Sequence, residues 1–418
     1  MKSKSFWSWL VSTLLLVGVG AQAPTFQTPV EVAEGGISCS IEAGEILCDD
    51  AVLDPWVAVD GSDNVYVAWS DRKANEIMLR RSTDGGKTFS DPINVSNTHD
   101  ESIEPKIAID SKNKLYVLWQ ENVGGTNREL FLSSSTDGGQ SFSEAVNVSN
   151  DPGQSGRHSI GFGEQILNDS FSIAFDKDDN VLIAWTDLDK EALLFSRSTD
   201  GGKTFSAPVE LPKGKTLPRL PAVAVDNEGN IYVTWANGGG ESGDISLIKS
   251  ADGGKTWSER LNITDNEGFS DGPDIAIDAE GNITIVFDDD TPELAGTHAA
   301  IIAFVRSTDG GKSFSAPKTI SNPIGGGFPA MAQDPKGNLF VSFSAISGRR
   351  SGGVGFTFSL DKGQSFAPAM ELDGTAPASV TPTRDVSIAV DSKGGIYVAS
   401  SAIRGQKTMI LLSLGKLP

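Results

Sequence analysis

Cysteine is nearly absent from this chain of 418 residues, which contains only Cys39 and Cys48. So small a number gives no support to catalysis by a thiol or to a cysteine-rich metal cluster. In an oxidising compartment the two cysteines are expected to form a disulfide across a short loop, which would contribute about 2–3 kcal/mol. A reactive thiol or a metal-binding pair is the alternative.

Basic residues are also scarce, with 34 Lys and Arg against 55 Asp and Glu and a formal net charge of −21. This balance disfavours nucleic acids and anionic membrane surfaces as partners, and it permits cations, basic proteins and neutral glycans. Solubility outside the cell explains the same charge without any ligand. The charge therefore excludes partners but does not choose a function.

Long apolar runs are missing except near the N-terminus. There the stretch from Leu10 to Val19 follows Lys2 and Lys4 and precedes small residues up to Ala23. This pattern predicts a secretory signal peptide over residues 1–23, because the apolar stretch is too short for a membrane span. We therefore expect an exported protein, periplasmic or extracellular, with no membrane insertion.

What the chain has in abundance is repetition. The pattern Ser-x-Asp-x-Gly-x-Thr/Ser-aromatic occurs six times, at a spacing of about fifty residues that indicates a repeat architecture. The copies are Ser82–Phe89, Ser135–Phe142, Ser198–Phe205, Ser250–Trp257, Ser307–Phe314 and Ser359–Phe366.

A second pattern, apolar-Ala-apolar-Asp followed by a polar turn and an alternating strand, occurs seven times. Its turns carry the Gly and Asn that a tight hairpin needs. Each unit predicts four antiparallel strands, such as Val65–Trp69 for the second and Glu76–Arg81 for the third. Such sheets should pack radially as propeller blades, because none can bury both faces alone. The aspartates that end the first strands are Asp60, Asp110, Asp176, Asp226, Asp278, Asp334 and Asp391.

The seventh unit, from residue 386 onward, predicts three strands and contains no copy of the first pattern. The segment Thr25–Val32 reads like the fourth-strand segment Thr204–Leu211 and supplies the missing strand. We therefore predict an all-β fold, a seven-bladed β-propeller of four-stranded antiparallel blades whose N-terminal strand closes the last blade. The predicted domains are the signal peptide over 1–23, the closing strand and disulfide loop over 24–54, and the propeller over 55–418.

The sixfold pattern resembles the Asp-box, or BNR repeat, of the sialidase-like β-propellers. The resemblance implies a structural hairpin in which the Asp side chain bonds turn amides and the aromatic ring packs into the sheet. Sialidases of this superfamily have six blades and use a Tyr nucleophile with Glu, an Asp acid/base and three arginines. Here Leu217–Pro221 resembles their arginine signature only distantly and supplies at most one arginine. Sialidase activity is not expected, because all the tyrosines share one strand position; they are Tyr66, Tyr116, Tyr232 and Tyr397.

Strand order places the first hairpin turns and the Asp-box turns on one face of the propeller. The second-to-third and fourth-to-first loops lie on the other face, which we call the loop face. Residues six or seven positions before each first-strand Asp should form the rim of the central channel there, and they differ between blades as a binding site requires. The ligand-binding candidates from this rim are Asp54, Glu104, Asp169, Arg219, Asp271, Arg384 and Asp385, beside the apolar Phe328.

All three histidines, His99, His158 and His298, fall in loops of the same face. His158 lies within a long Gly-rich loop from Ser149 to Ser170 and is added to the ligand-binding candidates. A loop of this length is expected to be either a lid over the channel or a disordered insertion.

An acidic run, Asp288, Asp289 and Asp290, follows the second strand of the fifth blade. Its spacing does not match an EF-hand loop, but hard oxygens near Asp271 could hold Ca²⁺. A solvated loop is the alternative, and no cofactor is required by the sequence.

The sequence favours a monomer that binds a glycan or a protein ligand through the loop face, because no recognisable catalytic set accompanies the scaffold. Two alternatives remain open. One is a glycoside hydrolase or lyase that uses the rim carboxylates. The other is a platform subunit of an envelope complex.

Overall fold

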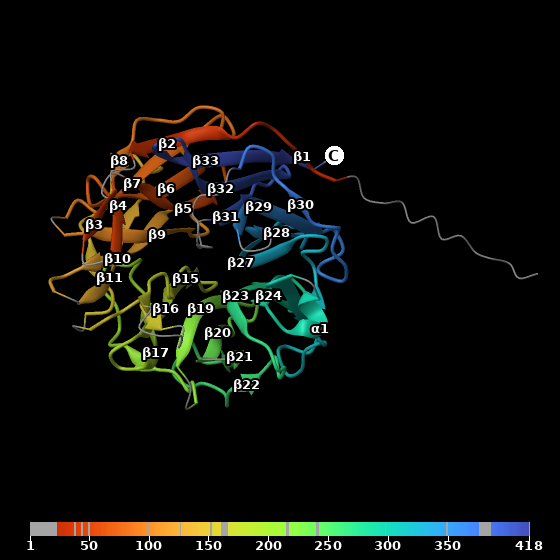
Figure 1. The fold of residues 1–418 in the computed structure, drawn as a ribbon. Coiled ribbons are helices and arrows are strands. Elements are labelled where there is room, and N and C mark those ends of the chain that lie inside the picture. Colours follow the sequence, from red (N-terminus) through yellow and green to blue (C-terminus); the bar gives the residue numbers. More distant parts are fainter. Residues whose placement is uncertain are drawn as a thin grey trace, which may run out of the picture.

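The computed structural model describes residues 23–36, 39–42, 45–48, 51–98, 100–125, 127–150, 153–159, 166–214, 217–239, 242–296, 298–347, 350–375 and 386–417. The predicted signal peptide thus lies outside the described residues, apart from its last residue. Within the described residues, seven antiparallel sheets surround a central axis, which confirms the predicted seven-bladed propeller (Figure 1). No helix in this part of the chain is long and apolar enough to cross a membrane.

Each blade begins with a strand beside the central axis and continues outward. The innermost strands are β5 (Val52–Val59), β9 (Ser102–Ile109), β15 (Phe171–Phe175), β19 (Pro218–Val225), β23 (Ser270–Ile277), β27 (Gly325–Gln333) and β31 (Val386–Val390). The second strands are β6 (Val65–Asp71), β10 (Leu115–Asn122), β16 (Val181–Asp187), β20 (Ile231–Gly239), β24 (Ile283–Asp289), β28 (Leu339–Ser347) and β32 (Gly395–Arg404).

The outer half of each blade is made of a long third strand and a short fourth strand. The third strands are β7 (Glu76–Ser82), β11 (Arg128–Ser135), β17 (Ala192–Ser198), β21 (Ser242–Ser250), β25 (Ile301–Ser307), β29 (Arg350–Ser359) and β33 (Lys407–Lys416). The fourth strands of blades 1 to 6 are β8 (Ile93–Asn94), β12 (Val146–Asn147), β18 (Val209–Glu210), β22 (Leu261–Asn262), β26 (Lys318–Thr319) and β30 (Met370–Glu371).

The last blade is closed by the N-terminal segment, as predicted. Strands β1 (Thr25–Phe26) and β2 (Val30–Gly36) both pair antiparallel with β33, and Figure 1 shows β2 alongside β33. Val32 is fully buried in a cluster with Ile410 and Leu412, so the closure buries apolar surface as well as strand edges. The propeller strand β5 already begins at Val52, so the domain boundary drawn at residue 54 lies inside a strand.

A hairpin of β3 (Cys39–Glu42) and β4 (Glu45–Cys48) connects the closing strand to blade 1. Its backbone register places Cys39 directly opposite Cys48. The side chains of this hairpin lie outside the described residues, so the disulfide stays a prediction.

The hydrophobic core lies between neighbouring blades rather than within one sheet. Among the described residues, seven buried clusters each join two adjacent blades around the ring. The second strands are covered on both faces, and every residue of β16 is buried. Their apolar runs therefore do not alternate with polar residues, as is usual for strands buried on both faces.

The turns of the sixfold Ser-x-Asp-x-Gly pattern are structural, as the repetition implies. In blade 1, Asp84 Oδ1 accepts hydrogen bonds from the backbone N–H groups of Lys87 and Thr88, both at 3.0 Å, and Thr88 Oγ1 donates to Asp84 Oδ2 at 2.7 Å. Gly85 and Gly86 supply φ angles of 74° and 80°. The tyrosines are structural too: in every blade that has one, the hydroxyl donates to the first-strand Asp, as in Tyr66 to Asp60 at 2.9 Å.

Side chains at one position of the innermost strands, four residues before the first-strand Asp, tie neighbouring blades together around the channel. At this position Trp56 Nε1 donates to the backbone of β9, and the Lys106 ammonium donates to the backbone of Phe171. Ser172, Asp274 and Ser387 accept backbone N–H groups from the next blade in the same way. Side chains at this position therefore join five of the seven pairs of neighbouring blades, whereas blades 4 and 6 have alanine there.

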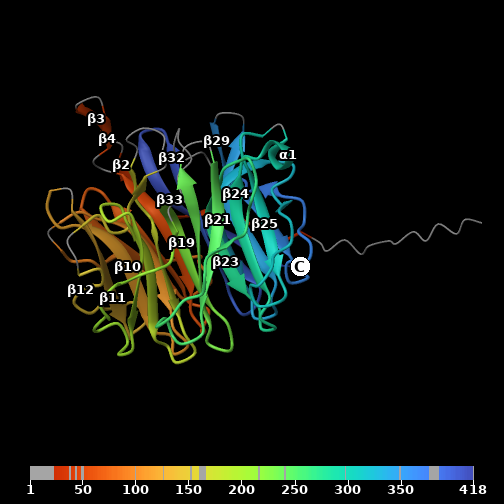
Figure 2. The ribbon, with the colours of Figure 1, turned by 90° about the horizontal axis from the view of Figure 1, so that it is seen from below.

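Figure 2 shows the propeller from the side, with the hairpin β3–β4 and the short helix α1 (Pro292–Ala295) on the same face. Helix α1 lies between β24 and β25, a second-to-third connection, so this is the loop face. The irregular segments that differ between repeats gather here.

Candidate functional site

The innermost strands bend at their loop-face ends, and the bend brings acidic side chains to the channel mouth. A β-bulge shifts the register of β5 next to Asp54 and that of β9 next to Glu104. Asp54 and Glu104 both have a φ of 56°, and Asp169, just before β15, has a φ of 66°. This left-handed conformation is costly for residues other than glycine and is often kept at functional sites. Asp54 and Glu104 at their bulges, and Asp169 just before its strand, therefore give one carboxyl group from each of three successive blades.

Lys106 on β9 connects blade 2 to blade 3 at this place. Its ammonium lies 2.7 Å from Asp169 Oδ1 and donates to the Phe171 backbone oxygen, also at 2.7 Å. The same ammonium lies 5.1 Å from the centre of the Trp56 ring and 4.9 Å from that of Phe171. The Lys106 side chain is 7% exposed and that of Asp169 is 11% exposed. The pair thus holds a charged carboxylate in a largely dry, aromatic surrounding.

Asp54 is a rim carboxyl whose pKa is changed by its surroundings. Its side chain is 12% exposed and lies 3.9 Å from the Arg72 guanidinium. Burial raises the pKa of Asp54 above its ordinary value, and the nearby Asp169 carboxylate adds to the rise, whereas Arg72 and Ser70 act in the opposite direction. Asp54 therefore holds its proton more tightly than an ordinary Asp, whereas Asp169 is paired with an ammonium.

Arg219 and Asp271, two further rim candidates, form a pair with each other at the junction of blades 4 and 5. Arg219 Nε lies 3.5 Å from Asp271 Oδ1, and the guanidinium lies 4.7 Å from the centre of the Phe269 ring. Arg219 also donates to the backbone oxygen of Gly238. Because Arg219 is fully buried, it holds loops of the loop face together and presents no surface to solvent.

His158 and the described parts of the long loop are built into the junction of blades 2 and 3. His158 lies in the two-residue strand β13 (His158–Ser159), which pairs with β14 (Ile166–Leu167), and it is 3% exposed. Gly156 donates its backbone N–H to Thr186 at 2.8 Å, and the Thr186 side chain donates to the backbone of Arg157 at 2.9 Å. These parts of the loop are ordered by blade contacts. The exposed apolar side chains of β14 are on this same segment.

The acidic run holds a loop in place. Asp289 Oδ2 accepts from Ser270 at 2.7 Å and from Asn266 at 3.0 Å, and Asp290 Oδ1 accepts the backbone N–H of Phe269 at 2.6 Å. Asp288 lies beside them on β24. Within the described chain, no group of three or more His, Cys, Asp or Glu side chains lies close enough together to hold a metal ion.

Three predicted residues lie outside the described residues: Arg384 and Asp385 on the rim of blade 7, and His99. His298 is described and lies in the loop that follows α1, where its backbone N–H donates to Ala295.

Sequence reasoning missed Lys106 and Arg72. Lys106 occupies the channel-lining position at which blades 4 and 6 have alanine. A charged residue at this position could therefore have been recognised in the sequence as a candidate site residue. Arg72 lies in a second-to-third loop, and no repeat position marks it. Its role depends on contacts between loops of different blades.

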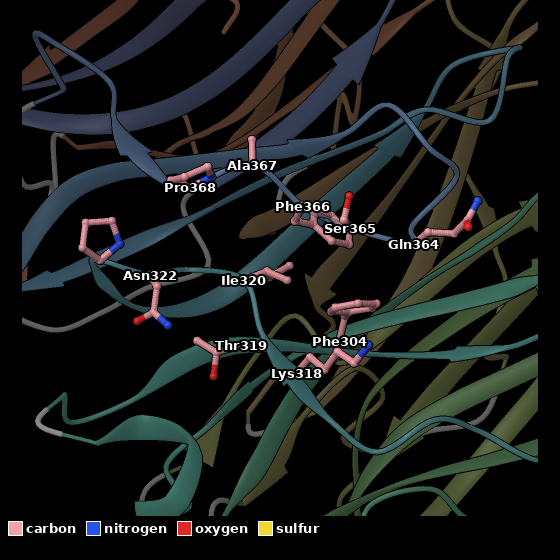
Figure 3. A pocket seen from close by; sticks show the side chains of 11 residues that line it. Phe304, Lys318, Thr319, Ile320, Asn322, Gln364, Ser365, Phe366, Ala367 and Pro368 are labelled. Atoms are coloured by element: carbon pink, nitrogen blue, oxygen red, sulfur yellow. The ribbon is translucent and has the colours of Figure 1, made fainter. Parts of the chain in front are cut away.

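A groove of about 600 Å³ lies away from the channel, at the outer edge between blades 5 and 6. Figure 3 shows Phe304 and Phe366 facing each other in it, with Lys318 and Gln364 nearby. None of its lining residues is acidic, and its walls are an outer strand and an Asp-box turn, which recur in other blades. The channel mouth, where the blades differ, is therefore the stronger candidate site.

The sequence matches no protein-family model, and it matches no curated protein. Among solved structures, the chain is similar to a protein of unknown function from Dyadobacter fermentans, with 16% identity, a TM-score of 0.53 and coverage of 93% of this chain and 99% of that one. It is similar to an ulvan lyase solved with GlcA(1-4)Rha3S, with 11% identity, a TM-score of 0.57 and coverage of 91% and 95%.

The chain is also similar to an α-L-arabinanase from Penicillium chrysogenum solved with arabinobiose, with 13% identity, a TM-score of 0.54 and coverage of 94% and 99%. At these identities the likeness establishes the propeller fold. The chain thus shares its architecture with enzymes that act on carbohydrates.

Proposed function

We propose that this chain is an exported Asp-box propeller that binds a glycan at the loop-face mouth of its central channel. The observation that carries the proposal is the group formed by Asp54, Lys106 and Asp169, in which titratable side chains of three blades lie close together beside aromatic rings. The rim position carries other side chains in other blades, among them Arg219 and Phe328, and such variation serves a ligand rather than the repeat.

Two further features support a glycan as the ligand. Aromatic rings beside polar groups suit a sugar, whose faces are apolar and whose edges carry hydroxyls. Solved structures with the same fold include a polysaccharide lyase and an arabinanase. Export is supported by the signal-like residues 1–23.

The test is binding of the purified protein to a panel of neutral and acidic polysaccharides, followed by substitution at the channel mouth. Lys106→Gln and Asp169→Asn should each weaken binding by about tenfold or more in protein that thermal unfolding shows to be folded, because each removes a polar group of the proposed site. Lys112→Gln is the matched control, since Lys112 forms a 2.7 Å ion pair with Asp179 near the first hairpin turns, on the opposite face. Binding that survives both channel-mouth changes would place the ligand elsewhere.

A second candidate function, hydrolysis or lyase cleavage of the glycan, is favoured by the unequal surroundings of Asp54 and Asp169. A carboxyl that keeps its proton can act as a general acid, and a second carboxylate can act as base or nucleophile. Release of reducing ends or of unsaturated products from the bound polysaccharide would reveal it. Asp54→Asn should then abolish turnover while leaving binding measurable, whereas a protein that releases no product from any polysaccharide it binds is a binding module.

A further inference from the structure

A cluster of three arginines lies beside the channel mouth. Arg72, Arg128 and Arg157 come from three successive loop-face segments: the β6–β7 loop, the start of β11 and the segment before β13. Arg72 Nη1 and Arg128 Nη2 donate to the two oxygens of one carboxylate, Glu101, each at 2.8 Å. In a chain with a formal charge of −21, such a gathering of guanidinium groups needs a specific cause.

Arg157 belongs to the same cluster by backbone contacts. The backbone of Arg128 exchanges hydrogen bonds with Gly153 and Ser155, at 2.8 and 3.0 Å, which brings the segment of Arg157 alongside. Burial lowers the pKa of Arg157, and the positive charge of Arg128 adds to this, whereas Asp189 and Glu101 act in the opposite direction. The segment of Arg157 thus lies against Arg128, and Arg157 Nη1 donates to Gln154 Oε1 at 2.7 Å.

The arginines have more hydrogen-bond donors than the described chain supplies acceptors. Arg128 Nε and Nη1 and Arg157 Nε are buried, and none has an acceptor among the described residues. A buried donor without a partner is unfavourable, because it has lost its bond to water. An anion with several oxygens would satisfy such donors in the planar geometry that guanidinium groups favour.

Glu101 is suited to leave the cluster when such an anion arrives. Its side chain is 32% exposed, and its carboxylate bonds only to the two arginines among the described contacts. Rotation into water would leave no buried carboxylate behind.

We propose that Arg72, Arg128 and Arg157 form a subsite for an acidic group of the bound glycan, a carboxylate or a sulfate ester, and that Glu101 occupies this subsite in the free protein. The subsite adjoins the channel mouth through Arg72, which lies 3.9 Å from Asp54. The inference rests on the proposed function and gives it a substrate class, an acidic polysaccharide.

The test is calorimetric titration of the full chain with glucuronate, glucose 6-sulfate and neutral glucose at matched ionic strength. The acidic sugar that fits, carboxylate or sulfate, should bind about tenfold more tightly than glucose. Glu101→Gln should tighten this binding several-fold, because it removes the competing carboxylate. Arg72→Gln and Arg128→Gln should each remove the advantage of the acidic sugar.

Arg197→Gln is the matched control, since the Arg197 side chain is 24% exposed against 23% for Arg72 and also pairs with a carboxylate, Asp176, but near the Asp-box. Thermal unfolding of each variant checks that it folds, and Glu101→Gln carries the test if an arginine variant does not. The inference fails if Glu101→Gln leaves acidic-sugar binding unchanged, or if Arg72→Gln behaves as Arg197→Gln does. Polysaccharide binding that is indifferent to these changes would leave the proposed function standing, whereas a chain that binds no glycan overturns both.

Discussion

Lys106 and Asp169 form a 2.7 Å ion pair that joins blade 2 to blade 3 at the channel mouth, with both side chains almost removed from solvent. Removing one member of such a pair leaves the other charge buried without compensation. Lys106→Met should therefore lower the free energy of unfolding by about 3–5 kcal/mol, measured by denaturant titration.

The matched control for this prediction is Lys112→Met, because the Lys112–Asp179 pair has the same 2.7 Å distance but a lysine that is 75% exposed. Its loss should cost less than about 1 kcal/mol. The double variant Lys106→Met with Asp169→Asn should recover much of the stability. Equal costs for the two lysines would contradict the assignment of a buried pair.

Removal of the Asp54 charge should stabilise the protein at neutral pH. A carboxyl whose folded pKa is raised binds its proton more tightly in the folded state. Its contribution to stability is therefore present below the ordinary Asp pKa and is lost as the pH rises from there through the raised folded pKa. Asp54→Asn should therefore raise the unfolding temperature at neutral pH, and the gain should vanish below about pH 4, where Asp54 is protonated in both states.

Asp63→Asn should have the opposite effect on stability from Asp54→Asn. A hydrogen bond from Lys393 lowers the pKa of Asp63, so this substitution should destabilise the protein at neutral pH. A loss of stability in Asp54→Asn as well would show that Asp54 is ordinarily ionised and structural.

Acid should destabilise the propeller through its Asp-box turns. Hydrogen bonds within the turn, first that of the Thr88 side chain, hold the pKa of Asp84 well below its ordinary value, and the pKa of the corresponding Asp is lowered in the other five turns. Below about pH 4 the unfolded chain binds more protons than the folded chain, so this stabilisation is lost as the pH falls. Urea unfolding across the acid range measures it, and Thr88→Val, which lacks one donor, should show a smaller loss.

The architecture could be predicted from sequence because it depends on local patterns. The seven copies of the apolar-Ala-apolar-Asp pattern, with their hairpin turns, predicted seven blades. The resemblance of Thr25–Val32 to a fourth strand indicated the closure that pairs Thr25 with Lys416. The rim position also predicted that Asp54, Glu104 and Asp169 meet at one face.

The chemistry at the rim could not be predicted in the same way, because it depends on which side chains of different blades contact one another. Arg219 and Asp271 share the rim position with Asp54, yet they form a buried ion pair with each other at the junction of blades 4 and 5. Glu101, Arg72 and Arg128 come from loops that no repeat position aligns, and only the packing of blades 1 and 2 brings them together.

Alkali should destabilise the protein through its tyrosines. Burial, together with the first-strand Asp that each hydroxyl bonds, raises the pKa of Tyr66, Tyr116, Tyr232 and Tyr397. Because the folded state keeps these protons, the stabilisation is complete below about pH 10 and is lost as the pH rises above it. The ultraviolet absorbance of tyrosinate should appear together with the loss of the β-sheet circular dichroism signal. Tyrosinate that forms while the fold persists would mean that the hydroxyls are accessible.

The β3–β4 hairpin should carry a disulfide in the exported protein, since its backbone register places Cys39 directly opposite Cys48. Intact mass before and after reduction and alkylation will detect the bond.

Reduction or the double variant Cys39→Ser with Cys48→Ser should cost at most about 2–3 kcal/mol, because the closed loop is short. The loss should appear as earlier proteolysis between β2 and β5, while the propeller keeps its unfolding temperature within a few degrees, since the strands β1 and β2 that close blade 7 precede the hairpin. Two free thiols in protein recovered from an oxidising compartment would contradict the prediction and leave the pair available as a metal-binding or reactive site.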